Sequence, residues 1–233
     1  ENVRICAVLN ERLPKRAGVE IKVFPGKEHR FVARFTAEGL SDALTDADPQ
    51  KDGKPRLPTS PITPEAAKAA ADEVKRCGTG ALSLVCDVGD EKQVKKMVAK
   101  AAKKFGPIDI LVNNAGYFPY NLFLDMTEAD WDLVQNTNIK GTFLFCQAAA
   151  RQIVKQGNGG KIVNIASVEG EFPITAGRTH YHATKGAVIN FTRGLAKELA
   201  QYKINVNAVA PGLTDTPGAQ AMTGGYGLAS FGE

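Results

Sequence analysis

The chain has 233 residues, 43% of them hydrophobic, and a formal net charge of +4. This length supports one substantial core, and the interspersed charges exclude a basic stripe for nucleic acid. No apolar run is long enough to span a membrane and no signal peptide is recognisable, so we expect a soluble, cytoplasmic protein without membrane partners. The cysteines and histidines lack metal-site spacing, so we predict no metal.

The first sixty residues predict two short strands. Residues 19–24 and 31–35 alternate between apolar and polar side chains, and the charged stretch 26–30 between them is typical of a hairpin connection. Prolines then become frequent. Residues 58–63 predict an extended junction, because proline cannot donate a hydrogen bond within a central strand.

From residue 63 onward, helices and strands alternate. Thr63 and Pro64 predict the start of a helix over residues 63–77, because a hydroxyl at the N-cap and proline at the first helical position favour initiation. The pattern then predicts a strand over 81–86, a helix over 90–105 and a strand over 108–112.

The second half continues this alternation. Thr127 is expected to cap a helix that carries Trp131 and Val134 inward. A strand over 161–167, a helix from Tyr181 and a strand over 204–209 follow. The predicted buried stripe of the last helix is Ala183, Ala187, Phe191, Leu195 and Leu199. Strands separated by helices of this length pair in parallel, which predicts an α/β fold with a doubly wound parallel sheet.

Tyr181 and Lys185 are the pair with the most chemical information. Residues four apart on a helix share a face, so the phenol and the ammonium are expected to project into one site. A free tyrosine, with a pKa near ~10, is a poor acid at neutral pH, and a nearby positive charge lowers that pKa. The pair predicts a proton donor; alone, it is equally typical of a solvated helix surface.

Polar clusters directly follow three predicted strands, and ligands of doubly wound sheets bind at the carboxyl ends of strands. The clusters are Asn113-Asn114-Ala115-Gly116, Ser167, and Pro211-Gly212.

In these motifs and their order, residues 64–217 resemble a short-chain dehydrogenase/reductase, a family with a Rossmann-like fold that transfers hydride between NAD or NADP and an alcohol or carbonyl substrate. The resemblance implies that Ser167 binds the substrate oxygen, Tyr181 exchanges the proton, and Lys185 binds the ribose while lowering the tyrosine pKa. Asn138 matches the fourth catalytic residue, whose helix irregularity holds a water in a proton relay.

The resemblance also implies a set of cofactor-binding residues. Asp87 matches the acidic residue that meets the adenine, the motif at 113–116 shapes the floor beneath the adenosine, and residues 211–214 meet the nicotinamide end. The implied set is Asp87, Asn113, Ala115, Gly116, Tyr181, Lys185, Pro211, Gly212 and Thr214. Candidate pocket walls are Phe118, Tyr120, Glu169, Phe172 and Pro173. Assembly as a homodimer or homotetramer is implied through residues 127–156 and 181–201.

The amino-terminal part departs from that family. The glycine-rich turn that receives the cofactor pyrophosphate is missing, because the glycines before the first shared helix lack its spacing. The residue that selects NAD or NADP cannot be placed either. At the other end, the fold is expected to be truncated, with residues 218–233 as an irregular tail.

Residues 3–53 instead resemble a fragment of an archaeal-type cofactor-independent phosphoglycerate mutase. This resemblance makes Arg30, Asp46 and Asp48 candidates for a phosphosubstrate surface; the alternative is a solvated turn region. The sequence therefore predicts a chimera in four parts: a mutase-like segment (1–57), a junction (58–63), a dehydrogenase-like core (64–217) and the tail.

We expect an NAD(P)-dependent oxidoreductase that acts on a small-molecule alcohol or carbonyl compound. Two alternatives stay open: a catalytically inactive chimera or scaffold, which the missing glycine turn favours, and a phosphometabolite-binding module related to the mutase.

Overall fold

The computed structural model describes residues 80–212, three short strands before them, and the helical residues Lys68, Ala71 and Asp72. The chain divides into two compact units, residues 1–10 with 86–212 and residues 11–85 with 213–233. Most of the helix predicted over 63–77 lies outside the described residues, as do Arg30, Asp46 and Asp48.

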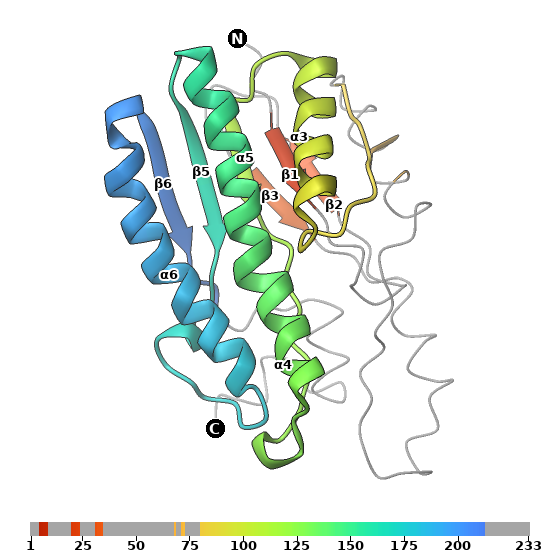
Figure 1. Ribbon diagram of the computed structural model, residues 1–233, viewed down its shortest axis with the longest axis vertical. Helices are drawn as coiled ribbons and strands as arrows, with labels where there is room; N and C mark the ends of the chain where they lie inside the picture. The colour runs from red at the N-terminus through yellow and green to blue at the C-terminus, as the bar shows by residue number, and fades with distance from the viewer. Residues whose placement is uncertain are drawn as a thin grey trace. The chain divides into compact units, whose positions relative to one another are not determined.

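The first unit is built on a four-stranded parallel sheet with the strand order β1-β4-β5-β6 (Figure 1). The strands are β1 (Ile5–Val8), β4 (Ile110–Asn113), β5 (Gly160–Ile165) and β6 (Ile204–Val209). β1 pairs with β4 from Ile5 opposite Ile110 to Val8 opposite Asn113. The parallel pairing confirms the predicted Rossmann-like α/β fold, and it brings the carboxyl ends of all four strands to one edge.

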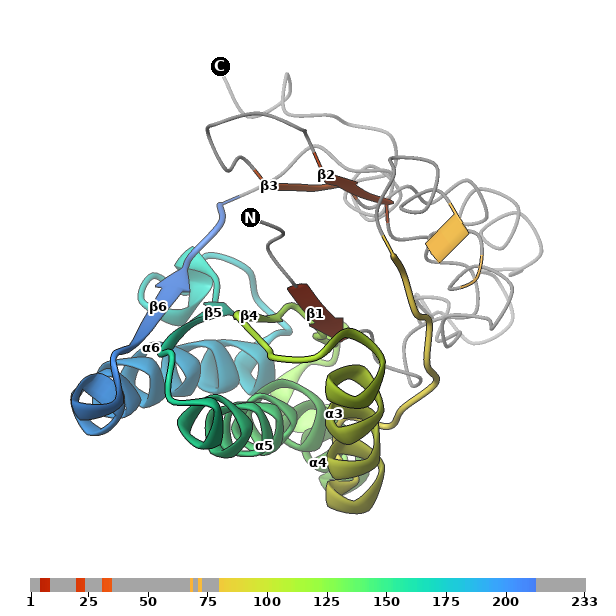
Figure 2. The same cartoon turned by 90° about the horizontal axis from the view of Figure 1, so that it is seen from above.

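The helices α3 (Glu91–Phe105), α5 (Gly141–Gln156) and α6 (Thr179–Leu199) lie on one face of this sheet (Figure 2). The shorter α4 (Glu128–Gln135) and the π-helix η2 (Asn136–Lys140) precede α5. Single 3-10 turns are η1 (Phe123–Asp125), η3 (Val168–Gly170) and η4 (Ala200–Tyr202). The core between helices and sheet includes Leu111, Phe145, Ile153, Ile162 and Val188, all almost fully buried.

Two helix starts follow from short polar side chains. The Asp90 carboxylate accepts hydrogen bonds from the backbone N–H groups of Lys92 and Gln93 and begins α3. Thr127 begins α4 in a capping box, in which its hydroxyl accepts from the Asp130 N–H and the Asp130 carboxylate accepts from the Thr127 N–H. The predicted cap at Thr127 is confirmed.

Three local predictions are wrong. Residues 81–86 form no strand and belong to neither described sheet. Trp131 is 37% exposed, although Val134 on the same helix is fully buried. The buried stripe of α6 is displaced by one residue and contains Thr184, Lys185, Val188, Ile189 and Thr192 instead of the predicted apolar set. The inner face of α6 is therefore half polar.

The second unit contains β2 (Glu20–Val23) and β3 (Phe31–Arg34), an antiparallel pair with Glu20 opposite Arg34. These strands confirm the two predicted for this region. β1 was not predicted at all.

None of the helices that the structure describes has both the length and the apolar character needed to cross a bilayer.

Candidate active site

Helix α6 places Tyr181 and Lys185 together at the carboxyl end of β5. Lys185 is only 5% exposed, and its ammonium donates a hydrogen bond to the carbonyl oxygen of Ile165, the last residue of β5, at 2.7 Å. The same ammonium lies 5.6 Å from the centroid of the Tyr181 ring. A buried cation is thus fixed between the strand end and the phenol.

Ser167 completes this group from the other side. It is 8% exposed, and its hydroxyl oxygen accepts a hydrogen bond from the backbone N–H of Glu169 at 3.2 Å. The Ser167 hydroxyl also hydrogen-bonds to the Tyr181 phenol. The structure therefore brings the predicted Ser167, Tyr181 and Lys185 into one site.

Asn138 lies in the π-helix η2, where the helix irregularity was expected, and is 1% exposed. Its side-chain oxygen accepts from the Tyr117 N–H at 2.7 Å, and its amide donates to the Tyr117 carbonyl at 2.8 Å and to the Thr184 hydroxyl at 3.0 Å. Single π-helical turns are frequent at functional sites. Asn138 reaches the site through Thr184, which lies between Tyr181 and Lys185.

The protonation chemistry of the pair differs from the expectation. Burial raises the pKa of the Tyr181 phenol and the Glu169 charge acts in the same sense, whereas the Ser167 hydrogen bond and the Arg178 charge lower it. The net direction is opposite to the lowering expected from Lys185, because burial is the largest of these effects. Burial lowers the pKa of Lys185 itself to about 8.

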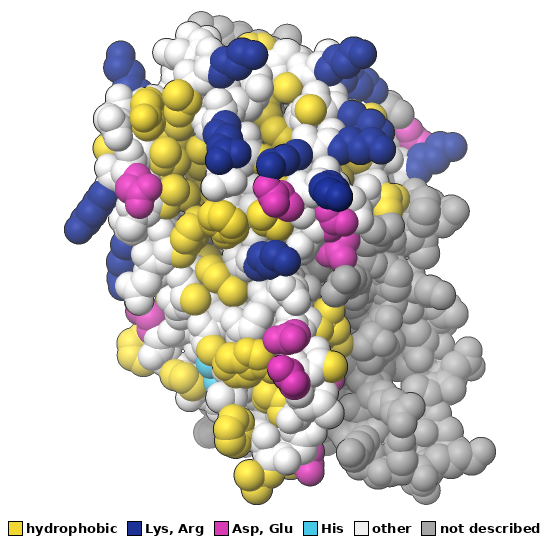
Figure 3. Space-filling model, viewed as in Figure 1, with side chains coloured by type: hydrophobic (Ala, Val, Ile, Leu, Met, Phe, Trp, Pro, Cys, Tyr) yellow, Lys and Arg dark blue, Asp and Glu magenta, His cyan; other side chains and the backbone are white. Residues whose placement is uncertain are grey.

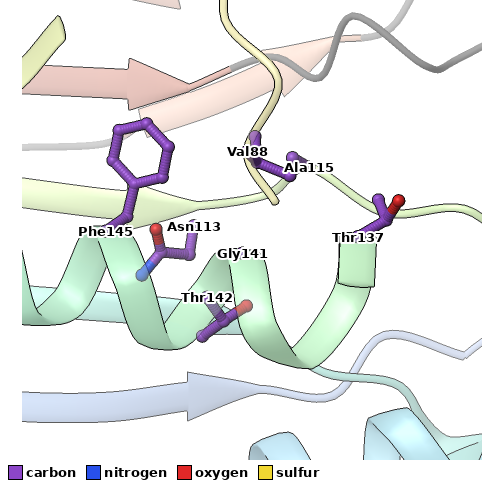
Figure 4. A pocket seen from close by; sticks show the side chains of 7 residues that line it. All are labelled: Val88, Asn113, Ala115, Thr137, Gly141, Thr142 and Phe145. Atoms are coloured by element: carbon purple, nitrogen blue, oxygen red, sulfur yellow. The ribbon is translucent and has the colours of Figure 1, made fainter. Parts of the chain in front are cut away.

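The residues expected on the adenosine side also meet near the sheet edge. Figure 4 shows Val88, Ala115, Thr137 and Gly141 around one internal space, which is about 10 Å³, the size of a single water. Gly141 is required there, because a Cβ on it would lie 2.6 Å from Val88 Cγ2. This contact holds Val88, and with it the neighbouring Asp87, beside the start of α5. Asp87 itself accepts from the Gly89 N–H at 2.9 Å.

Gly116 lies directly beside the candidate catalytic residues Lys185 and Asn138. A Cβ on it would be 3.7 Å from both the Lys185 ammonium nitrogen and the Asn138 side-chain oxygen. A side chain at this position would thus be in contact with both the ammonium and the Asn138 amide.

Asn113 is turned into the core. Its amide donates to the Asn164 side-chain oxygen at 2.8 Å and to the Cys146 sulfur at 3.1 Å. These bonds tie β4 to β5 and α5. The contribution of the Asn113 side chain is to hold the strand end in place.

The loop after β6 reaches the same site. The carbonyl of Pro211 accepts from the Val168 N–H at 3.1 Å, which places residues 211–212 next to the turn that follows Ser167. Thr214 lies outside the described residues.

The sequence analysis did not identify two residues that make contacts at this site, Thr184 and Arg178. The Thr184 hydroxyl bridges the Asn138 amide and the Tyr181 carbonyl, and the Arg178 guanidinium lies 3.5 Å from the Glu169 carboxylate. The available signal was a threonine directly before Lys185 and an arginine one turn before Tyr181. Within residues 80–212, no three His, Cys, Asp or Glu side chains are grouped as a metal site would require.

Comparison with known protein families agrees with this geometry. The model of the short chain dehydrogenase family matches residues 54–226. The chain belongs to this family. A second model, that of 2,3-bisphosphoglycerate-independent phosphoglycerate mutase, matches residues 1–81, so a mutase-like segment precedes the dehydrogenase part.

Individual relatives give the same assignment. The 2-dehydro-3-deoxy-D-gluconate 5-dehydrogenase of Dickeya dadantii is 42% identical over 158 residues, which are 66% of this chain and 61% of the relative. A 3-oxoacyl-(acyl-carrier-protein) reductase of Staphylococcus aureus is 42% identical over 148 residues, 64% of this chain and 59% of the relative. The chain thus spans about three fifths of the length of these short-chain dehydrogenases.

A solved structure is equally similar. The short-chain type dehydrogenase/reductase of Mycobacterium marinum superposes with a TM-score of 0.62 at 40% identity, over 64% of this chain and 59% of the other. These relatives support a general oxidoreductase function for this chain.

Proposed function

We propose that this short-chain dehydrogenase is an NAD(P)-dependent oxidoreductase that interconverts a secondary alcohol and a ketone. The observation that carries the proposal is the convergence of Ser167, Tyr181 and Lys185 at the end of β5, with Asn138 bonded to the intervening Thr184. The two enzymes compared above are named for a keto sugar acid and a 3-oxoacyl group, and both substrates carry a ketone.

The described residues fit a nicotinamide cofactor on the ribose side. A buried ammonium suits the hydroxyls of a ribose, and the neighbouring Gly116 has no side chain to compete for contact with it. The residues proposed for the cofactor site are those inferred from the sequence, with the Asn113 side chain acting by holding the end of β4: Asp87, Asn113, Ala115, Gly116, Tyr181, Lys185, Pro211, Gly212 and Thr214. When bound, the nicotinamide would supply or accept the hydride.

The chain's own residues would manage the proton. Ser167 would donate a hydrogen bond to the substrate oxygen, and Tyr181 would give its phenolic proton to that oxygen during reduction. Lys185, whose pKa is about 8, is a stronger acid than an ordinary lysine and would restore the phenolic proton. Thr184 and Asn138 would keep the start of α6 in register with the π-helix.

We also propose that a second copy of the chain covers the outer groove between α5 and α6. The groove is about 620 Å³ and is lined by Phe143, Val154, Phe191, Leu195, Leu199 and Tyr202, with six other residues. Figure 3 shows apolar side chains gathered over α5 and α6, with basic side chains over these helices as well as over α3. An apolar face of this kind is typical of a protein interface and supports the homodimer or homotetramer. The cytoplasmic location stays a prediction.

Fluorescence titration of the purified protein with NADH, and separately with NADPH, tests the proposal. We expect saturable binding of one of them, followed by turnover in a screen of secondary alcohols and ketones. Tyr181→Phe should still bind the same cofactor but lose turnover. Absence of binding at millimolar cofactor would contradict the proposed activity.

The match of residues 1–81 to the mutase family favours one second candidate, a chimera whose first segment binds a phosphometabolite. The ends of the two matches, residues 54 and 81, bracket the proposed junction at 58–63 and the start of the dehydrogenase-like core at 64. Calorimetric titration with 3-phosphoglycerate separates the candidates. Binding of phosphoglycerate without any binding of NADH or NADPH would favour the chimera, with the dehydrogenase part as a scaffold.

A further inference from the structure

A cluster of three charged or titratable side chains flanks Tyr181. The Glu169 carboxylate is at its centre, and the residue is only 7% exposed. One carboxylate oxygen lies 3.5 Å from the Arg178 guanidinium, and the other lies 3.6 Å from Nε2 of His182. The Glu169 and Arg178 side chains are 9% and 15% exposed, so water screens this pair poorly.

The cluster is connected to the phenol by direct contacts. The backbone N–H of Glu169 donates to the Ser167 hydroxyl oxygen, and the Ser167 hydroxyl bonds to Tyr181. On the opposite side, the Phe118 ring lies between the cation and the phenol, with its centroid 5.8 Å from Arg178 Cζ and 6.0 Å from the Tyr181 ring centroid. A carboxylate and a guanidinium whose own side chains are largely buried therefore lie close to the phenol.

We propose that Glu169 and Arg178 are positioning residues that tune the acid strength of Tyr181 in opposite directions. Glu169 keeps the phenol protonated, and Arg178 favours the phenolate. This inference deepens the proposed function and, as a statement about catalysis, rests on it. The directions follow from Coulomb interaction with the phenolate, since a nearby carboxylate repels it and a guanidinium attracts it. The Glu169 charge does raise the pKa of Tyr181, and the Arg178 charge lowers it, on top of the larger rise caused by burial.

Other groups also face the phenol. The segment after β5 contributes Ser167 and Glu169. Arg178, at the N-cap of α6, is followed on the helix by His182 and Lys185. The loop after β4 contributes the uncharged Phe118. Both Lys185 and His182 are retained in every variant. The inference therefore concerns differences between variants and wild type.

The phenol can be titrated without substrate or cofactor. In protein labelled with ¹³C at Cζ of tyrosine, Tyr181→Phe identifies one of the five tyrosine signals as Tyr181. We expect Glu169→Gln to move the Tyr181 midpoint to lower pH and Arg178→Gln to move it to higher pH. Where turnover is measurable, the pH profile of kcat/KM should move in the same directions.

Two controls separate charge from structure. Arg178→Lys keeps the charge and should titrate close to wild type. The exposed pair Arg193 and Glu171, 3.2 Å apart with side chains 65% and 48% exposed, has the same chemistry in water, and Glu171→Gln should leave the midpoint unchanged.

The inference is overturned if the Glu169→Gln and Arg178→Gln midpoints move in the same direction or stay at the wild-type value. It is also overturned if Arg178→Lys shifts the midpoint as far as Arg178→Gln. Should Glu169→Gln not fold, the two Arg178 variants decide alone. An enzyme with no turnover but with the expected opposed shifts would overturn the proposed activity and leave the tuning of Tyr181 intact.

Discussion

The inner face of α6 is more polar, and its outer face more apolar at several positions, than an amphipathic helix normally shows. The inner face buries Thr184, Lys185 and Thr192 together with Val188. The outer face leaves Ala183 and Ala187 exposed and Phe191 only partly covered. Polar residues face the core because each has a bonding partner there, and apolar residues face outward where we propose a second copy binds. Burial on this helix follows the available partners more than hydrophobicity.

The inner face is held by two equivalent pairs. The Thr184 hydroxyl donates to the Tyr181 carbonyl and accepts from the Asn138 amide. About two turns further along α6, the Thr192 hydroxyl donates to the Val188 carbonyl and accepts from the Asn164 amide. In each pair a buried hydroxyl and a buried amide are hydrogen-bonded to each other. Only the first pair lies next to the candidate catalytic residues Tyr181 and Lys185.

The largest effect is expected at the site end of the inner face. Tyr181→Phe removes the proton donor while keeping the ring contact with Phe118. We expect kcat to fall by about 10²- to 10⁴-fold, with cofactor binding retained. Steady-state kinetics and NADH titration measure the two quantities. A variant with full turnover would show that another group donates the proton.

The buried ammonium gives the next largest effect. The folded-state pKa of Lys185, about 8, lies below the ordinary lysine value of 10.5. Between these pH values the unfolded chain therefore binds more protons than the folded protein, and the free energy of unfolding rises with pH. Lys185→Met lacks this dependence. The stability of wild type relative to Lys185→Met should therefore increase by about 3 kcal/mol from pH 8 to pH 10.5. Urea unfolding of both proteins across this range tests it, and a flat difference would contradict the buried charge.

The two threonines provide a matched pair. Thr184→Val and Thr192→Val make the same change on one helix, and each leaves a buried amide without its acceptor, so each should cost about 1–3 kcal/mol of stability. Only Thr184→Val should also lower kcat, by about tenfold, because it loosens the backbone that orients Tyr181. Equal kcat values in the two variants would place Thr184 outside the catalytic group.

The outer face should give the smallest effect on the fold. Phe191 packs edge-to-face against Phe143, with ring centroids 6.5 Å apart, in the proposed interface groove. Phe191→Glu should abolish association in sedimentation experiments and change monomer stability little, by about 0.5 kcal/mol or less. Leu124, 94% exposed and outside this groove, gives the control: Leu124→Glu should associate like wild type. A Phe191→Glu protein that still associates would exclude this interface.

The sequence predicted this architecture well where the signals are local. The cap at Thr127 and the strands β4, β5 and β6 depend on neighbouring residues, and all are present. The prediction of which face of α6 is buried was wrong. Helical periodicity identifies an apolar face but does not tell whether the core or another chain covers that face. β1 was missed because its pairing with β4 is long-range and four apolar residues carry little signal.

The candidate site shows the same division. Residues of strong chemical character, Ser167, Tyr181 and Lys185, were recognised from the motif, and the structure brings them together. Thr184 and Arg178 were not, since a threonine or an arginine on a helix is ordinary until its partner is known. The direction of the Tyr181 pKa was wrong for a related reason: burial is a property of the fold.

The pairing of β1 with β4 also bears on how the protein is made. Ile5 leaves the ribosome well before its partner Ile110, and at ordinary translation speed the delay is roughly 5 to 20 s. During that interval β1 is an unpaired strand, able to join β4 of a neighbouring nascent chain on the same polysome. The topology of this sheet therefore favours strand exchange between nascent copies. We expect this exchange to become more frequent as the density of ribosomes on the mRNA increases.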